Sequence, residues 1–115
     1  MKEGERNGKG KEYEDGNLIF EGEYLNDKRN GNGKEYNKKG KIIFDGEFVN
    51  GKRWNGKGYN KNGIIDFEIK HGNGKGKEYN DYGELEFEGE YLNGKRWKGK
   101  EYYSNHLILE GKYLI

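Results

Sequence analysis

Closely spaced carboxylates are the first candidates for chemistry in this sequence. Three pairs are separated by one residue: Glu21 and Glu23, Asp45 and Glu47, and Glu88 and Glu90. On one face of a strand the two carboxylates of such a pair lie about 6.5–7 Å apart. This distance falls at the lower end of the range that separates the two catalytic carboxyl groups of inverting glycosidases. A catalytic pair occurs once in a chain, whereas these pairs recur. Recurrence favours a structural role, in which each carboxylate pairs with a lysine on the neighbouring strand.

The remaining reactive residues do not form a catalytic set. His71 and His106 lie next to turn signals, and Ser104, near His106, has no carboxylate at a defined place to orient the pair. The glycine-rich stretch 72–77 lacks the Ser or Thr and the following helix of a nucleotide-binding loop. There is no cysteine, and therefore no thiolate metal site. We predict no catalytic residues, no metal and no cofactor.

Basic dipeptides followed by tryptophan are the most distinctive polar feature. Lys28-Arg29, Lys52-Arg53 and Lys95-Arg96 occupy one repeated turn position, and Trp54 and Trp97 follow two of them. If the turns stack, these residues form a basic row along one edge, a candidate contact for a partner protein or for anionic lipid. The alternative is that the lysines and arginines simply keep the turns solvated, and as exposed turn charges they would contribute little to folding.

An internal repeat of about 23 residues organises the chain. Gly-Lys-x-Tyr begins at Gly10, Gly33, Gly56, Gly76 and Gly99. Between these copies runs an aromatic-acidic-Gly-x-aromatic segment, and the third unit is degenerate, with Phe67 where the alignment expects glycine. We predict one domain, 1–115, with units at 8–30, 31–55, 56–73, 74–97 and 98–115.

The aromatic segments alternate with period two, as half-buried strands do. The predicted structural face consists of Phe20, Gly22, Tyr24, Phe44, Gly46, Phe48, Phe87, Gly89 and Tyr91. Glycine weakens the middle of a strand unless another group approaches closely. We therefore expect Gly22, Gly46, Gly89 and Gly111 to be floors on which a neighbouring tyrosine ring lies.

Turn signals separate the segments. Gly16, Gly40, Gly63 and Gly83 close one set of turns, Asn105 takes the same place in the last unit, and Asn-Gly or a related pair closes the other set. Scattered glycines, 21 in all, disfavour helix. The predicted fold is all-β: a single-layer antiparallel meander of about five stacked β-hairpin repeats, elongated and curved, with ten or eleven strands.

These units resemble MORN repeats in a Lys- and Asn-rich form. The resemblance rests on the stretch from Phe20 to Tyr24, on Asn26, on Gly31-Asn-Gly33 and on the run from His71 to Gly74, and it extends over nearly the whole chain. It implies a sheet of stacked hairpins without catalysis of its own. Similar repeats serve as protein scaffolds, as dimerising rods, as proposed phospholipid binders and in antitoxin-like bacterial proteins.

Composition limits the partners. The net charge is +1, too small a positive surplus for a nucleic-acid-binding domain. No apolar stretch approaches a membrane span, and residues 1–20 have no signal-peptide core, so we expect a cytoplasmic protein, either free or peripheral to a membrane. The expected function is a non-enzymatic scaffold that binds another protein or a second copy of itself, through its aromatic face or its terminal edges. The alternatives are binding to anionic phospholipid through the basic row, and a ligand-binding or antitoxin-like repeat.

Overall fold

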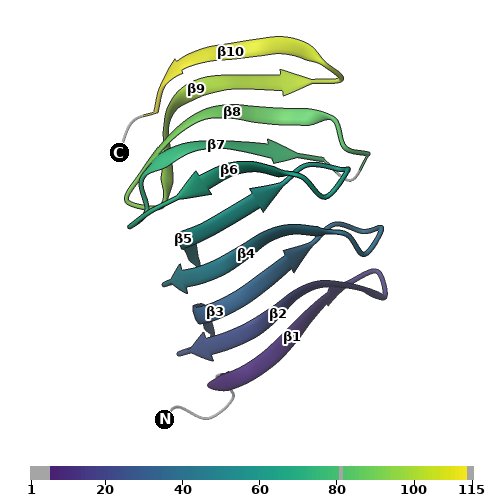
Figure 1. Ribbon diagram of the computed structural model, residues 1–115, viewed down its shortest axis with the longest axis vertical. Helices are drawn as coiled ribbons and strands as arrows, with labels where there is room; N and C mark the ends of the chain where they lie inside the picture. Colours follow the sequence, from purple (N-terminus) through teal and green to yellow (C-terminus); the bar gives the residue numbers. More distant parts are fainter. Residues whose placement is uncertain (1–5, 81, 114–115) are drawn as a thin grey trace.

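The computed structural model describes residues 6–80 and 82–113, which contain ten strands and no helix. The strands are β1 (Gly8–Glu14), β2 (Asn17–Leu25), β3 (Lys28–Tyr36), β4 (Ile42–Val49), β5 (Lys52–Tyr59), β6 (Ile65–Ile69), β7 (Gly74–Tyr79), β8 (Leu85–Leu92), β9 (Lys95–Tyr103) and β10 (His106–Lys112). Consecutive strands pair antiparallel from β1 to β6 and again from β7 to β10, and β1 and β10 lie at opposite ends of the stack (Figure 1). The predicted all-β meander is confirmed.

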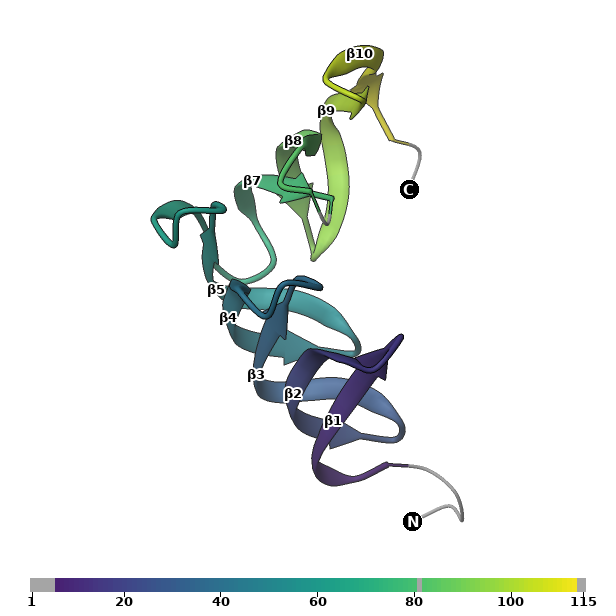
Figure 2. The same cartoon turned by 90° about the vertical axis from the view of Figure 1, so that its right-hand side faces the viewer.

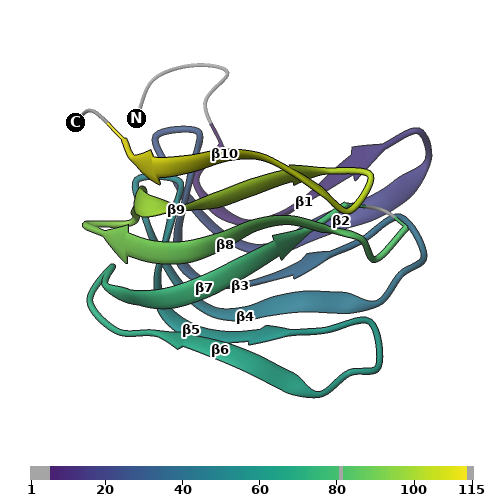
Figure 3. The ribbon, with the colours of Figure 1, turned by 90° about the horizontal axis from the view of Figure 1, so that it is seen from above.

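The meander is divided into two sheets. Strands β1 to β6 form one sheet and β7 to β10 form the other. At the junction between β6 and β7, only a single bridge, from Lys70 to Asn73, joins the two strands. The stack bends there (Figure 2), and its principal extents are 43 × 31 × 22 Å. Seen from above, the individual strands also curve, so that one face of each sheet is concave (Figure 3).

A row of glycines crosses each sheet at the middle of its strands. In the first sheet Gly10, Gly22, Gly33, Gly46 and Gly56 are successive cross-strand partners, and in the second Gly76, Gly89, Gly99 and Gly111 are. A Cβ placed on Gly46 would lie 2.0 Å from the carbonyl oxygen of Asn55 on the next strand. No side chain fits in that space, and the glycine row therefore permits the tight curvature.

The aromatic rings of the core pack against glycines other than those predicted from the sequence. A Cβ on Gly10 would meet the ring of Tyr24 at 2.9 Å, and one on Gly33 would meet that of Phe20 at 2.5 Å. The predicted floors Gly22, Gly46 and Gly89 instead face the backbone of the following strand, and the fourth, Gly111, has no described atom within 4 Å of an added Cβ. That expectation was wrong because strand curvature brings neighbouring backbones closer than a flat sheet would.

The aromatic face is a core and not an open surface. Its buried members are Phe20, Tyr24, Phe44, Phe48, Ile69, Phe87 and Tyr91. Successive rings meet edge to face, as Phe20 and Phe48 do with centroids 5.1 Å apart, an arrangement favoured by the ring quadrupoles. The curled sheet itself covers this face, so the aromatic face is not the open partner surface that was one of the two expected from the sequence.

The degenerate third unit explains the break between the sheets. Ile69, not Phe67, takes the glycine position, because it pairs with Gly56, while Phe67 pairs with Gly58 as Phe44 does. His71 and Gly72 then form the turn earlier than Asn50 and Gly51 do after Phe44. The shortened hairpin has no room for the second aromatic residue or for the arginine of the other units. Without them β6 and β7 separate after one bridge.

The turns form as predicted. Asn50 and Gly51 both have positive φ, 50° and 84°, the conformation of a two-residue hairpin turn that Asn and Gly accept most readily. Each such turn is tied to the preceding repeat: the amide of Asn50 donates to the side chain of Asn30, and the amide of Gly51 donates to the carbonyl of Arg29. The turns consequently stack along one edge of the molecule, as expected.

Candidate functional site

The arginines of the Lys-Arg pairs point onto the aromatic face. Arg29 lies with its guanidinium 4.1 Å from the centroid of the Phe20 ring. Its Nε and Nη2 donate to the two carboxylate oxygens of Glu12, at 2.8 and 3.2 Å. Tyr24 donates its hydroxyl to the same carboxylate, at 2.6 Å. The glutamate thus joins an arginine and a tyrosine from two other strands.

The pair of arginine and glutamate recurs in later repeats, although Phe48 takes the place of the tyrosine in the second unit. Arg53 pairs with Glu35 at 2.7 Å and covers Phe44, and Arg96 pairs with Glu78 at 2.6 Å and covers Phe87. The carboxylates come from the Gly-Lys-Glu-Tyr motif, and each arginine lies two strands further along the chain. Each cluster therefore links three consecutive strands.

Electrostatics support this arrangement. The hydrogen bond from Arg29 holds the pKa of Glu12 below its ordinary value. Burial, together with the hydrogen bond to Glu12, raises the pKa of Tyr24 to about 12. The hydrogen bond to Glu78 likewise raises the pKa of Arg96. All three groups keep one protonation state at neutral pH, which suits a structural network rather than acid–base catalysis.

The predicted basic row is therefore reduced to lysines. Lys28 and Lys95 are exposed, and Lys52 is half-buried beneath the turn at Gly94. The three arginines are half-buried on the core side, because a bidentate carboxylate and an aromatic face stabilise a guanidinium better than an ammonium. The interpretation of these arginines as solvated turn charges was wrong.

The two tryptophans are half-buried. The ring of Trp54 lies against Gly72, where an added Cβ would come within 2.6 Å of it, and the carbonyl of Trp54 accepts a hydrogen bond from the Gly72 amide. Trp97 lies at the corresponding place in the last hairpin, and the ammonium of Lys112 is 5.7 Å from its ring centroid. Trp54 thus holds the turn at the junction of the two sheets.

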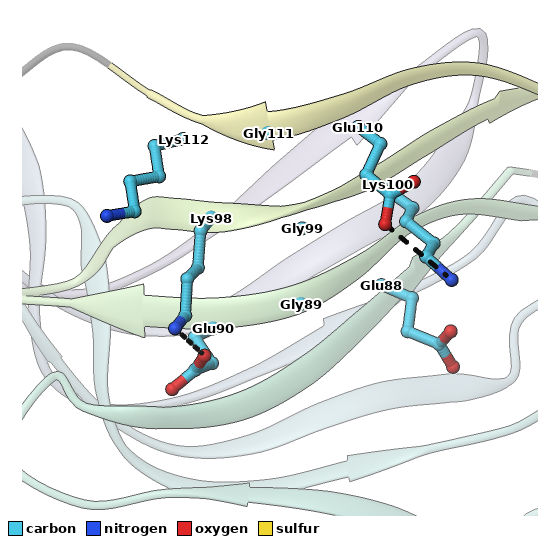
Figure 4. A pocket seen from close by; sticks show the side chains of 9 residues that line it. All are labelled: Glu88, Gly89, Glu90, Lys98, Gly99, Lys100, Glu110, Gly111 and Lys112. Atoms are coloured by element: carbon cyan, nitrogen blue, oxygen red, sulfur yellow. Dashed lines mark ion pairs between the residues drawn. The ribbon is translucent and has the colours of Figure 1, made fainter.

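The opposite face of the sheet carries paired charges. Lysines and acidic residues alternate across the strands, as in the series Lys11, Glu21, Lys34, Asp45, Lys57 and Glu68. In the second sheet, Lys98 and Glu90 are 3.1 Å apart. Figure 4 shows such side chains on both sides of a shallow groove whose floor contains Gly89, Gly99 and Gly111. Five of the six recurring carboxylates thus face a lysine, as expected, whereas Glu47 faces Asn32 and Asn55. The alternating charges leave this face with little net charge.

No reactive cluster appears in the part of the chain that the structure describes. His71 and His106 are exposed, and His71 is a turn residue with φ of 52°. Among residues 6–80 and 82–113, no three His, Asp or Glu side chains gather in a way that would hold a metal ion. No described segment forms a helix long and apolar enough to cross a membrane.

Strand β10 is the largest exposed apolar element. All seven of its residues are exposed, including Leu107, Ile108 and Leu109, and Tyr103 is exposed just before it. Only β9 pairs with it among the described strands. Its outer edge therefore presents free hydrogen-bonding groups beside apolar side chains, the usual features of a strand that pairs with another chain. Sequence reasoning did not single out these residues; the signal was Leu109 in place of a phenylalanine.

Curved antiparallel hairpins, three of which carry an aromatic-x-Gly-x-aromatic strand, define the class as an all-β hairpin-repeat protein. The family model of the MORN repeat matches residues 1–18, 20–41, 44–58 and 87–107, which is more than half of the chain. The protein belongs to the MORN-repeat family. The gap in the match, between residues 58 and 87, contains the degenerate unit and the junction of the two sheets. No curated protein and no solved structure matched the chain.

Proposed function

We propose that this protein is a non-enzymatic scaffold that binds a protein partner through the outer edge of β10. The observation that carries the proposal is the exposure of every residue of that strand, with three consecutive aliphatic side chains. An edge strand offers unpaired backbone groups for strand addition, and neighbouring apolar side chains supply the contact area. Family membership supports the proposal, because MORN repeats generally act in protein or membrane interactions.

Affinity capture from native lysate with edge variants tests this function. Leu109→Lys places a charge at the middle of the proposed contact, and we expect it to abolish capture of the partner. Ile64→Lys changes a side chain of similar exposure in the turn between β5 and β6, and we expect it to leave capture unchanged. Equal recovery of the same proteins by wild type and by Leu109→Lys would rule out the β10 edge as the binding site.

A second candidate function is weak binding to anionic lipid. It is favoured by the stacked turns, which place Lys28 and Lys95 on one edge of the molecule with both side chains exposed. Each lysine near an anionic surface contributes about 1 kcal/mol, and screening at physiological salt shortens the reach of the field to about 8 Å.

Sedimentation with vesicles that contain phosphoinositide tests the lipid candidate. We expect little binding at physiological salt, and the Lys28→Glu, Lys95→Glu double variant to bind like wild type. Tight binding that this variant loses would favour the membrane over the protein partner. Arginine variants are unsuitable here, because Arg29, Arg53 and Arg96 support the core.

A further inference from the structure

We propose that the partner at the β10 edge is a second copy of this chain, and that β10 of one copy pairs antiparallel with β1 of the next. The inference rests on the proposed function and names the partner for that site. The pairing continues the register of the sheets, with Gly111 opposite Gly10 of the second copy. The two strands lie at opposite ends of one molecule (Figure 1), so a single type of contact links copies end to end.

The first observation is the exposure of Leu109. This residue pairs with Glu101 as Phe20 pairs with Glu12 and Phe87 with Glu78. Phe20 and Phe87 are 0% exposed, whereas Leu109 is 55% exposed. The difference lies in the following strand: Gly33 and Arg29 of β3 cover Phe20. The equivalent covering residues for Leu109 are Gly10 and Arg6 of a second copy.

The second observation is that Gly111 has no neighbour that requires a glycine. A Cβ on Gly22 would lie 2.5 Å from the carbonyl oxygen of Asn32, and one on Gly89 would lie 2.2 Å from that of Lys98. In both cases the crowding backbone belongs to the following strand. At Gly111, the next member of the row, no atom of the described residues 6–80 and 82–113 lies within 4 Å of an added Cβ. A strand added outside β10 restores the close approach found at the other glycines.

The third observation is an incomplete arginine cluster at the end of the stack. Tyr113 donates its hydroxyl to Glu101, just as Tyr24 donates to Glu12 and Tyr91 to Glu78. The latter two glutamates each also accept two hydrogen bonds from an arginine of the following strand. Glu101 has only a longer ion pair, of 3.8 Å, with Arg96 of its own strand β9, so the bidentate arginine is the missing member of the cluster.

The matching arginine in the proposed pair is Arg6. It stands four residues before Gly10, as Arg29 stands four residues before Gly33. Within one copy Arg6 is exposed and is bonded to Asp27 at 2.6 Å. Pairing of β1 with β10 would place it beside Glu101 of the first copy, where a bidentate hydrogen bond is worth more than on the open surface.

Charges across the proposed junction are largely complementary. Glu110 comes opposite Lys11 of the second copy, as Glu21 is opposite Lys34 and Glu88 opposite Lys100 within the chain. One like-charged pair results, Lys112 with Lys9, which weakens the contact and keeps it dependent on concentration. Because the two surfaces differ, the contact does not close on itself as a two-fold dimer does, and it generates open chains of copies.

Sedimentation velocity over a wide concentration series tests assembly directly. We expect the average mass of the wild-type chain to rise continuously with concentration. Leu109→Lys should remain monomeric, whereas the matched control Ile64→Lys should assemble like wild type. Far-ultraviolet dichroism of each variant checks that it is folded. A wild-type chain that stays monomeric at every concentration overturns the proposal, even if lysate capture identifies a different protein at β10, a result that would leave the proposed function standing.

Charge reversal in trans identifies the two edges. Glu110→Lys alone and Lys11→Glu alone should each weaken assembly about three- to tenfold, because an opposite-charge pair becomes a like-charge pair. An equimolar mixture of the two variants should assemble again, since the lysine introduced into one variant then faces the glutamate introduced into the other. Lys112→Glu should strengthen assembly by a similar factor.

A two-fold contact between two β10 strands gives a different result. Such a dimer would stop at twice the monomer mass and would not respond to Lys11→Glu. Either of these outcomes, or a mixture that fails to recover assembly, would contradict end-to-end pairing.

Discussion

At the scale of single residues, the fold depends on positions where adding or removing a small side-chain group disrupts the packing. Gly46 marks the closest approach of two strand backbones, and Arg53 joins a carboxylate to an aromatic ring. In a thin sheet, few other contacts are available to compensate for a change at either place. Both residues recur with the repeat, and the consequences of changing them should therefore hold for their equivalents.

Gly46→Ala should lower the free energy of unfolding by about 2–4 kcal/mol, because its Cβ would overlap the carbonyl oxygen of Asn55 and force the strands apart. Gly51→Ala is the matched control: its Cβ enters open space, so that only the positive φ is unfavourable, a cost of about 1 kcal/mol. Urea unfolding of both variants measures the difference. A Gly46→Ala variant no less stable than Gly51→Ala would show that the backbones do not approach this closely.

Arg53→Ala should lower the free energy of unfolding by about 2–3 kcal/mol, since it leaves the half-buried Glu35 without its bidentate partner and uncovers Phe44. The exposed Lys28 is the comparison, and Lys28→Ala should change stability by less than about 0.5 kcal/mol. Thermal or urea unfolding distinguishes the two. If both variants are equally stable, the interpretation of Arg53 as a solvated turn charge is correct and its contacts with Glu35 and Phe44 contribute little to stability.

Stability should fall at acidic pH through the carboxylates of the arginine clusters. The pKa of Glu12 is lowered in the folded state by its hydrogen bond from Arg29. The charged form therefore stabilises the fold above the ordinary value of 4.5, and this contribution is lost as the pH falls through the lower, folded-state pKa. Glu12→Gln should be less stable than wild type at neutral pH, and the difference should shrink below pH 4.5.

Urea unfolding across the acidic range follows this convergence. The control is Glu68→Gln, which changes an exposed carboxylate of β6 and should have nearly the stability of wild type. A difference for Glu12→Gln that does not vary with pH would argue against the proposed ionic contact.

At the scale of elements, the junction between β6 and β7 is the weak point of the stack. One bridge joins the two strands, whereas the other neighbouring strands are joined by ladders of several residue pairs, each with one register shift. The Trp54 ring lies against Gly72 and compensates in part for the missing pairs. The two sheets should behave as separate units in hydrogen exchange, because contiguous ladders open together.

Trp54→Ala should loosen this junction and speed amide exchange in β6 and β7 more than in β2 and β3. Trp97→Ala removes the corresponding ring from the last hairpin, beyond the junction, and should leave β6 and β7 unaffected. Hydrogen exchange with mass detection resolves the strands. Uniform acceleration across both sheets in Trp54→Ala would mean that the chain opens as a single cooperative unit.

At the scale of the whole molecule, the charged face and the aromatic face contribute differently. Alternating lysines and carboxylates leave a net charge of only +1, and their pairs are mostly exposed. The rings and arginines of the curled side are shielded from solvent and supply the specific contacts. Electrostatic attraction over long distances is therefore a minor contribution to stability and to partner binding.

Raising the salt concentration from about 0.1 to about 1 M should change the free energy of unfolding by less than about 1 kcal/mol, because exposed ion pairs contribute little even at low salt. Urea unfolding at both concentrations provides the measurement. A loss of several kcal/mol would show that the charged rows, rather than the aromatic core, hold the strands together.

The sequence by itself determined the repeat, the strands and the turns. Glycine at a fixed interval, alternating aromatic residues and Asn-Gly pairs each act locally, and local preferences are enough to predict hairpins and their order. Tertiary structure alone decided which glycine lies under a ring, where Arg29, Arg53 and Arg96 point, and that Ile69 interrupts the row. Those outcomes depend on the curvature of the sheet, which brings together residues from three strands and is not encoded at any one position. The same curvature buried Phe20, Phe44 and Phe87 completely, left Phe67 at the junction partly exposed, and left Leu109 exposed.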